Sequence, residues 1–213
     1  MQIKIIKNLI ISLCTASCLL LGIAAKAASS NDPPPLAMLK ATADKIIVEL
    51  DKHRQTLKSD DALVNGIVRR LALPHFDANA MARSVVGRQF WQTSTPNVQK
   101  QFTNEFTQYV IRTYAAALAN YNGQKIRFFP MRGYDASQSR AQVNSEILQN
   151  DGPPIPVSYR LIRTGSGNWL VYDFSVEGVS IIQNYRSQFA STLSKSGLAG
   201  LVAEVHAHNQ KLR

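Results

Sequence analysis

Apolar residues recur at helical spacing through the first half of this chain, where they predict a series of helices. From Leu36 to Leu57 they return every three or four positions, with charged residues largely between them, which is typical of an amphipathic helix. Capping and breaking residues then delimit three more helices: one from the Ser59-Asp60-Asp61 cap to Pro74, a short one over 78–86, and a long one from Ser94-Thr95-Pro96 to Asn122-Gly123.

The pattern changes after Gly123, and the next fifty residues predict a sheet. Apolar and polar residues alternate over 138–149 and 155–163, and two further strands are predicted over 124–132 and 169–176. Short polar turns join the strands, which favours an antiparallel meander.

Two helices complete the prediction. One runs from Val179 to about Lys195, and Ser196-Gly197 separates it from a last helix that ends near Leu212. Helices on both sides of a meander predict an α+β fold, in which helices cover one face of a curved antiparallel sheet. Covering such a sheet on one side creates a deep apolar pouch.

The first 27 residues are interpreted as a secretory signal peptide. Lys4 and Lys7 precede a stretch without charge over 9–25, and Ala25-Lys26-Ala27 offers small residues for cleavage after Ala27. The apolar stretch is slightly short for a membrane anchor, and a lipoprotein site at Cys18 fits less well because apolar residues continue beyond it. We therefore expect an exported, periplasmic protein.

Composition narrows the chemistry of the exported chain. Lys and Arg number 24 and Asp and Glu 14, a formal charge of +10; without residues 1–27, which hold three lysines and no acid, 186 of the 213 residues remain with a charge of +7. Both cysteines, Cys14 and Cys18, leave with the signal, so neither a disulfide nor a thiolate metal site is expected. The positive charge favours anionic lipid headgroups or acidic protein faces, because nucleic acid is scarce outside the cytoplasm.

No catalytic motif stands out in the mature chain. It has no phosphate-binding glycine loop, no Gly-x-Ser-x-Gly elbow and no His-Glu-x-x-His pattern. His206 and His208 are two positions apart, so they point to different sides of a helix and no metal is expected there. Asp77, close to His75, is interpreted as the cap of the helix over 78–86.

Asp173 is the one candidate for a catalytic group. It lies within the apolar strand 169–176, where a carboxylate either pairs with an arginine or serves as a base in a pouch, as in isomerases that abstract a proton beside a carbonyl. The salt bridge is the favoured interpretation, because no companion oxyanion donor is identifiable.

Three blocks of residues resemble a known family. The first is Leu73-Pro74-His75-Phe76-Asp77 with Val85-Val86-Gly87-Arg88, and the second runs from Phe102 through Tyr114 to Tyr121-Asn122-Gly123. The third and most specific extends from Trp169 through Glu177-Gly178-Val179-Ser180 to Phe189. Their order and spacing resemble the MlaC family, also called the toluene-tolerance auxiliary family, of periplasmic phospholipid carriers in Gram-negative bacteria.

The resemblance implies a fold and a function. It implies a cone-like sheet of the nuclear-transport-factor type, packed against several helices and enclosing an apolar cavity for acyl chains. It further implies a carrier without cofactor or catalytic activity, which shuttles phospholipid between an outer-membrane lipoprotein complex and an inner-membrane ATP-driven complex and so maintains outer-membrane lipid asymmetry. We expect residues 1–27 as signal, 28–35 as a linker, and 36–213 as one monomeric lipid-binding domain near membrane surfaces.

Pattern and resemblance together predict the cavity lining. The apolar faces of the predicted helices and strands supply it, although periodicity does not decide between odd and even positions on the last strand, where Leu170, Tyr172 and Phe174 are equally apolar. The predicted lining residues are Phe76, Met81, Val85, Phe106, Tyr109, Tyr114, Val143, Ile147, Val157, Tyr159, Leu161, Trp169, Val171, Val179 and Ile182.

Two other functions compete with the carrier. One is a cone-fold isomerase or dehydratase that acts on a hydrophobic substrate through Asp173, and the other is a periplasmic binder of a different apolar ligand. Recovery of bound phospholipid would distinguish the carrier from both.

Overall fold

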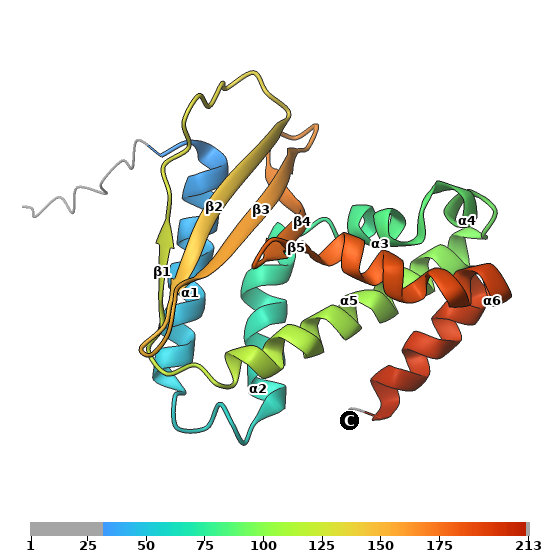
Figure 1. Cartoon of the computed structure of the whole chain (residues 1–213), viewed down its shortest axis with the longest axis horizontal. Coiled ribbons are helices and arrows are strands. Elements are labelled where there is room, and N and C mark those ends of the chain that lie inside the picture. The colour runs from blue at the N-terminus through green and yellow to red at the C-terminus, as the bar shows by residue number, and fades with distance from the viewer. Residues whose placement is uncertain (1–31, 212–213) are drawn as a thin grey trace, which may run out of the picture. The chain divides into compact units, whose positions relative to one another are not determined.

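The computed structural model describes residues 32–211 (Figure 1). The predicted signal peptide and most of the predicted linker lie outside these residues. The helices are α1 Pro34–Lys52, α2 Asp61–Ile67, α3 Ala78–Val86, α4 Arg88–Gln92, α5 Pro96–Leu118 and α6 Ile181–Lys211, with a π-helical turn at Val68–Ala72 and a 3₁₀ turn at Leu73–His75. The strands are β1 Lys125–Phe128, β2 Arg140–Leu148, β3 Ile155–Arg163, β4 Trp169–Val176 and β5 Val179–Ser180.

Side-chain caps begin three of the helices as the sequence predicts. Asp60 accepts a hydrogen bond from the Leu63 amide at 2.8 Å, and Asp77 accepts one from the Ala80 amide at 2.8 Å. Thr95 caps α5 in the same way, and each cap satisfies an amide that the helix itself leaves unpaired.

The predicted linker ends two residues earlier than expected. Helix α1 begins at Pro34, within the proline run, and ends at Lys52 rather than at Leu57. Proline is compatible with the first helical turn because the amides there have no intrahelical acceptor. The prediction of a linker over 28–35 is therefore wrong for Pro34 and Pro35.

The C-terminal helices differ from prediction at their start. Val179 and Ser180 form β5, paired with Ser175 and Val176, so the helix starts at Ile181. Gly197, with φ 62° and ψ −168°, breaks α6 where an interruption was predicted. Short α4 was not predicted, because Gly87 separates it from α3 by a single residue.

The sheet is the predicted antiparallel meander, with five strands in the order β1-β2-β3-β4-β5. Register places Val143 opposite Tyr159, and Tyr159 opposite Phe174. Arg160 pairs with Asp173 and Leu161 with Val171, so a bulge on β4 leaves Tyr172 without a partner on β3.

This bulge decides which positions of β4 face inward. Cross-strand partners share a face, so Val171 before the bulge and Phe174 after it both point to the inner side of the sheet. The inward positions are therefore odd in the first part of the strand and even in the second.

Helices contact the sheet at two places. Helix α1 lies along the inner face, where Leu36 and Leu39 pack against strand residues. Helices α3, α5 and α6 pack against one another and approach the sheet through β4 (Figure 1). The mixed α+β class with a curved antiparallel sheet is confirmed, although α1 alone supplies most of the helical cover over the middle of the sheet.

Candidate functional site

Helices α3, α5 and α6 enclose a cluster of apolar side chains rich in aromatic rings. Phe102 and Phe106 stack with centroids 5.6 Å apart, and Phe106 meets Tyr185 edge to face at 5.3 Å. We call this group the helix cluster; its buried members include Met81, Val85, Phe102, Phe106, Ile182, Tyr185, Phe189, Leu193 and Leu201.

A second cluster lies between α1 and the inner face of the sheet. We call it the sheet cluster; its buried members are Leu36, Leu39, Val143, Leu161, Trp169 and Val171. Alternation along β2 and β3 directs Val143 and Leu161 to one side, as the sequence predicts, and pairing with β3 places Val171 on the same side.

Phe76 and Phe174 pack against both clusters. Their rings meet edge to face at 6.0 Å, and Tyr114 meets Phe174 at 5.2 Å. Burial, with a smaller effect from Tyr185, raises the pKa of Tyr114 to about 12, so its hydroxyl stays neutral. We call these three residues the junction.

The backbone holds the junction in place. Phe76 forms an isolated parallel bridge with Val171, and the Asp77 amide donates to the Val171 carbonyl at 2.8 Å. The residue that caps α3 therefore also fixes the start of this helix to β4. His75 precedes it, and burial, with a smaller effect from Lys45, lowers the pKa of its imidazole.

Most of the predicted lining residues lie in or beside these two clusters. Met81, Val85, Phe106 and Ile182 belong to the helix cluster, while Val143, Leu161, Trp169 and Val171 belong to the sheet cluster. The others are partly buried against a cluster or lie on the inner sheet face: Phe76, Tyr109, Tyr114, Ile147, Val157 and Tyr159.

Two expectations about the lining need correction. Val179 is 57% exposed, because β5 pairs with the end of β4 and carries it to the surface. The interior that we expected to be hollow is filled in this structure, since side chains such as Phe102, Phe106 and Leu161 are completely or almost completely buried against their neighbours.

Phe76 also lines a pocket that opens between α3, α5 and the end of α6. We call it the side pocket; its volume is about 500 Å³. Leu73, Phe76 and Ala78 contribute apolar surface, and Arg69 and Arg112 lie among its polar lining residues. It is thus apolar next to the junction and polar elsewhere.

Hydrogen bonds between Glu105 on α5 and two residues of α6, His206 and Asn209, border this pocket, and we call them the tie. His206 lies 2.8 Å from a Glu105 carboxylate oxygen, and Asn209 donates to the other oxygen at 2.7 Å. Burial opposes ionisation of Glu105, but the hydrogen bonds from His206 and Asn209 outweigh it and lower its pKa.

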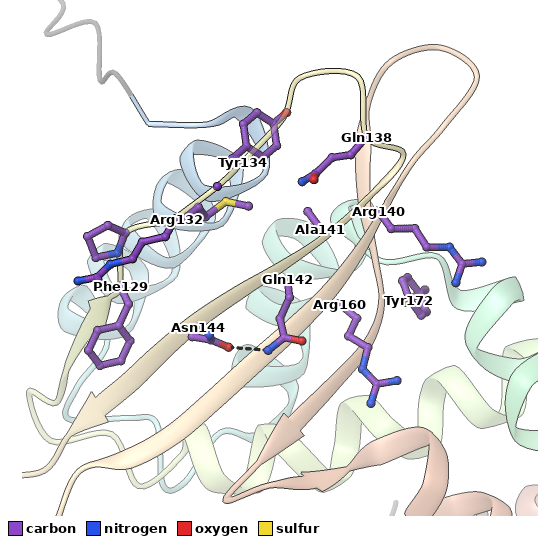
Figure 2. Close-up of a pocket in the computed structure, with 13 residues that line it drawn as sticks. Phe129, Arg132, Tyr134, Gln138, Arg140, Ala141, Gln142, Asn144, Arg160 and Tyr172 are labelled. Carbon is purple, nitrogen blue, oxygen red and sulfur yellow. Dashed lines mark hydrogen bonds between the residues drawn. The ribbon is translucent and has the colours of Figure 1, made fainter.

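The outer face of the sheet carries a second, basic pocket (Figure 2). Strands β2, β3 and β4 form its floor, and the 129–138 loop forms its wall. We call it the basic groove; its volume is about 590 Å³, and its lining includes Arg132, Arg140, Arg160, Gln138, Gln142, Asn144, Tyr134 and Tyr172.

Asp173 lies beneath the start of α6 and not in either pocket. Its carboxylate accepts hydrogen bonds from the Ser180 hydroxyl at 2.8 Å and the Ile182 amide at 3.2 Å. Arg160 adds an ion-pair contact at 3.5 Å. These partners support the structural interpretation of Asp173 over the catalytic one.

Residues 32–211 offer neither a metal site nor a membrane-spanning helix. No cluster of three or more His, Cys, Asp or Glu side chains in this range could hold an ion. The same residues include no helix with the length and apolarity to span a bilayer.

Comparison with known proteins gives a consistent result. The family model described as MlaC protein matches residues 40–207. Toluene tolerance protein ttg2D of Pseudomonas putida is 27% identical over 163 residues, which cover 76% of this chain and 74% of the relative. The intermembrane phospholipid transport system binding protein MlaC of Haemophilus influenzae is 27% identical over 173 residues, covering 80% of both proteins.

A solved structure extends the comparison. The phospholipid-binding protein of Ralstonia solanacearum, determined in complex with a phospholipid, superposes with a TM-score of 0.77 at 29% identity. The match covers 84% of this chain and 99% of the Ralstonia chain.

Proposed function

Because the chain belongs to the MlaC family, whose model matches residues 40–207, we propose that it is a periplasmic phospholipid carrier that holds acyl chains at the junction. The observation that carries this location is the position of Phe76 and Phe174, which pack against both apolar clusters. The Ralstonia relative, solved with a phospholipid, supports the choice of ligand.

Transfer energetics explain why such a carrier needs an apolar interior. Two acyl chains hold about 30 methylenes, and at about 0.8 kcal/mol each their exposure to water costs on the order of 20 kcal/mol. An interior about as apolar as a bilayer offsets most of this cost. Exchange with a membrane is then nearly neutral, and the affinities of docking partners set its direction.

The filled interior must open to admit an acyl chain. We propose that it opens at the junction, where the fewest packing contacts are broken. Phe76, Phe174 and Tyr114 are only partly buried, so moving them breaks fewer contacts than moving a fully buried side chain such as Phe102. The side pocket reaches Phe76 from the surface. We propose that acyl chains pass along this route and separate the two clusters.

The family also suggests where lipid is collected and delivered. The relative in Haemophilus influenzae is named as the binding protein of an intermembrane phospholipid transport system. We propose that this chain likewise shuttles lipid between inner-membrane and outer-membrane complexes and so maintains outer-membrane lipid asymmetry. No nucleotide motif lies in the sequence, so energy for directed transport must come from a partner.

Replacement of Phe174 tests the site. Stripped of lipid and mixed with phospholipid vesicles, the unaltered protein should recover about one phospholipid per chain, measured by organic extraction and mass spectrometry. Phe174→Asp should lose most of this lipid, because a charge at the junction makes insertion of methylenes unfavourable. Phe174→Leu should retain it, since the side chain stays apolar.

Val179→Asp is the matched control, because it places the same charge at an exposed apolar residue of the adjacent strand. It should reload like the unaltered protein. Equal lipid recovery by Phe174→Asp and Val179→Asp, with both variants folded by circular dichroism, would contradict the proposed site.

A further inference from the structure

The floor of the basic groove lies on the opposite face of the sheet from the proposed lipid site, and only Met131, Tyr134 and Ala141 of the groove lining also pack against the sheet cluster. Gln142, Asn144 and Arg160 lie in it, whereas the intervening residues Val143 and Leu161 point into the sheet cluster. Successive strand residues face opposite sides, so the sheet itself lies between the groove and the acyl-chain site. Lipid carriage does not explain the composition of this face.

Positive charge is concentrated in the groove. Arg132, Arg140 and Arg160 come from the loop, β2 and β3, and no acidic residue is among the lining residues. Arg160 lies 3.5 Å from Asp173, but within residues 32–211 neither Arg132 nor Arg140 forms an ion pair. The Arg140 guanidinium lies 5.9 Å from the centroid of the Tyr172 ring. Guanidinium groups in such a setting are suited to carboxylates, which they bind through paired hydrogen bonds.

The amide side chains in the lining indicate which kind of molecule carries the acidic groups. Gln138, Gln142 and Asn144 supply amides, each with a donor and an acceptor, as an extended peptide backbone requires. The Gln142 amide already donates to Asn144 at 3.1 Å, so the two side chains are held together on the floor (Figure 2). The headgroups of a bilayer lie in a broad plane. Because the 129–138 loop forms a wall beside the floor of the groove, such a plane does not reach the residues on the floor.

We propose that the basic groove docks an acidic, extended segment of a protein partner. The three arginines bind its carboxylates, and the amide side chains and Tyr172 contact its backbone and remaining side chains. Docking on the outer face leaves the junction and the side pocket free to open. The proposal concerns partner recognition and does not depend on which ligand the interior carries.

Binding of a defined peptide tests the groove. The probe is a fluorescein-labelled ten-residue peptide of alternating Glu and Ser, titrated with the purified protein and followed by fluorescence anisotropy. Arg132→Glu and Arg140→Glu should each weaken its binding by about tenfold or more, because each replaces an attraction by a repulsion. Arg160 is left unchanged, since it also contacts Asp173.

Arg88→Glu is the matched control. It makes the same charge change at an exposed arginine of α4 whose hydrogen bond is to Gln92 and which is not among the groove residues. Its peptide affinity should stay within about twofold of the unaltered protein, at equal salt. An equal loss in Arg88→Glu, or no binding of the peptide by the unaltered protein, would overturn the proposal.

Two further readouts separate the alternatives. Cosedimentation with phosphatidylglycerol vesicles should be the same for the groove variants and Arg88→Glu; a loss confined to the groove variants, with peptide binding retained, would assign the groove to a membrane surface instead. Lipid content after reloading should be normal in the groove variants, so failure of the docking proposal is distinguishable from failure of the carrier proposal.

Discussion

At the scale of single residues, Asp173 shows how a buried carboxylate serves the fold. The residue is 3% exposed, and a buried charge is tolerated only where partners replace water. Ser180 and the Ile182 amide provide them at the first turn of α6, where the helix dipole also favours a negative charge. The carboxylate thereby joins β4 to the start of α6.

Asp173→Asn should lower the free energy of unfolding by about 1–3 kcal/mol, because the amide removes the charge and one of the two acceptors. Lipid recovered per folded chain should not change. Urea unfolding measures the first effect and extraction with mass spectrometry the second. Asp151→Asn, in an exposed turn, is the control and should change neither; a well-folded Asp173→Asn that no longer binds lipid would contradict the structural role.

At the scale of elements, two local irregularities, the bulge on β4 and the break at Gly197, set the direction of the segments that follow them. The bulge on β4 turns Phe174 toward the helices, and Gly197 redirects α6 so that its end reaches α5. The backbone of Gly197 lies in a region that is essentially restricted to glycine. The interruption at Ser196-Gly197 therefore sets the path of the last helical segment.

Gly197→Ala should destabilise the protein by about 1–3 kcal/mol, although an added Cβ would meet nothing within 4 Å. The expected cost comes from backbone conformation alone. Gly66→Ala, near the end of α2 where the π-helical turn continues the helical path, also has no neighbour within 4 Å and should stabilise by about 0.5–1 kcal/mol. Urea unfolding of both variants checks the opposite signs; stabilisation by Gly197→Ala would show that the break is not required.

At the scale of the whole molecule, the helix cluster and the sheet cluster meet at the junction, and a small number of backbone and side-chain hydrogen bonds fix the elements around it. The backbone bridge between Phe76 and Val171 links them on one side. The tie from Glu105 to His206 and Asn209 holds the last segment of α6 against α5, beside the side pocket. On the proposed entry route through the side pocket, the strength of this tie sets how readily the pocket widens.

Acid should loosen this tie. The pKa of Glu105 in the folded protein is lower than its ordinary value of 4.5, so its ionised form contributes stability above that value. This contribution is lost as the pH falls through the folded pKa. Hydrogen exchange of residues 198–211 should accelerate, beyond the intrinsic pH effect, between about pH 5 and pH 3.

Glu105→Gln should remove this pH dependence. Glu204→Gln, on the last segment of α6 and bonded to Thr192, is the control and should retain it. Persistence of the acid-induced opening in Glu105→Gln would assign it to another group.

The sequence alone determined the helices with side-chain caps, the meander and the candidate family, because these depend on residues close together in the chain. Asp77 and Thr95 mark their helices by local hydrogen bonds, and the alternation over 140–148 and 155–163 marks strands. Apolar periodicity likewise marked many of the side chains that the two clusters bury.

Only the tertiary structure decided how those apolar faces meet. The bulge that turns both Val171 and Phe174 inward depends on pairing with β3, and the exposure of Val179 depends on its place beside the end of β4. The basic groove likewise brings together Arg132, Arg140 and Arg160 from separate segments. Contacts between distant segments produce these features, and no local pattern in the chain encodes them.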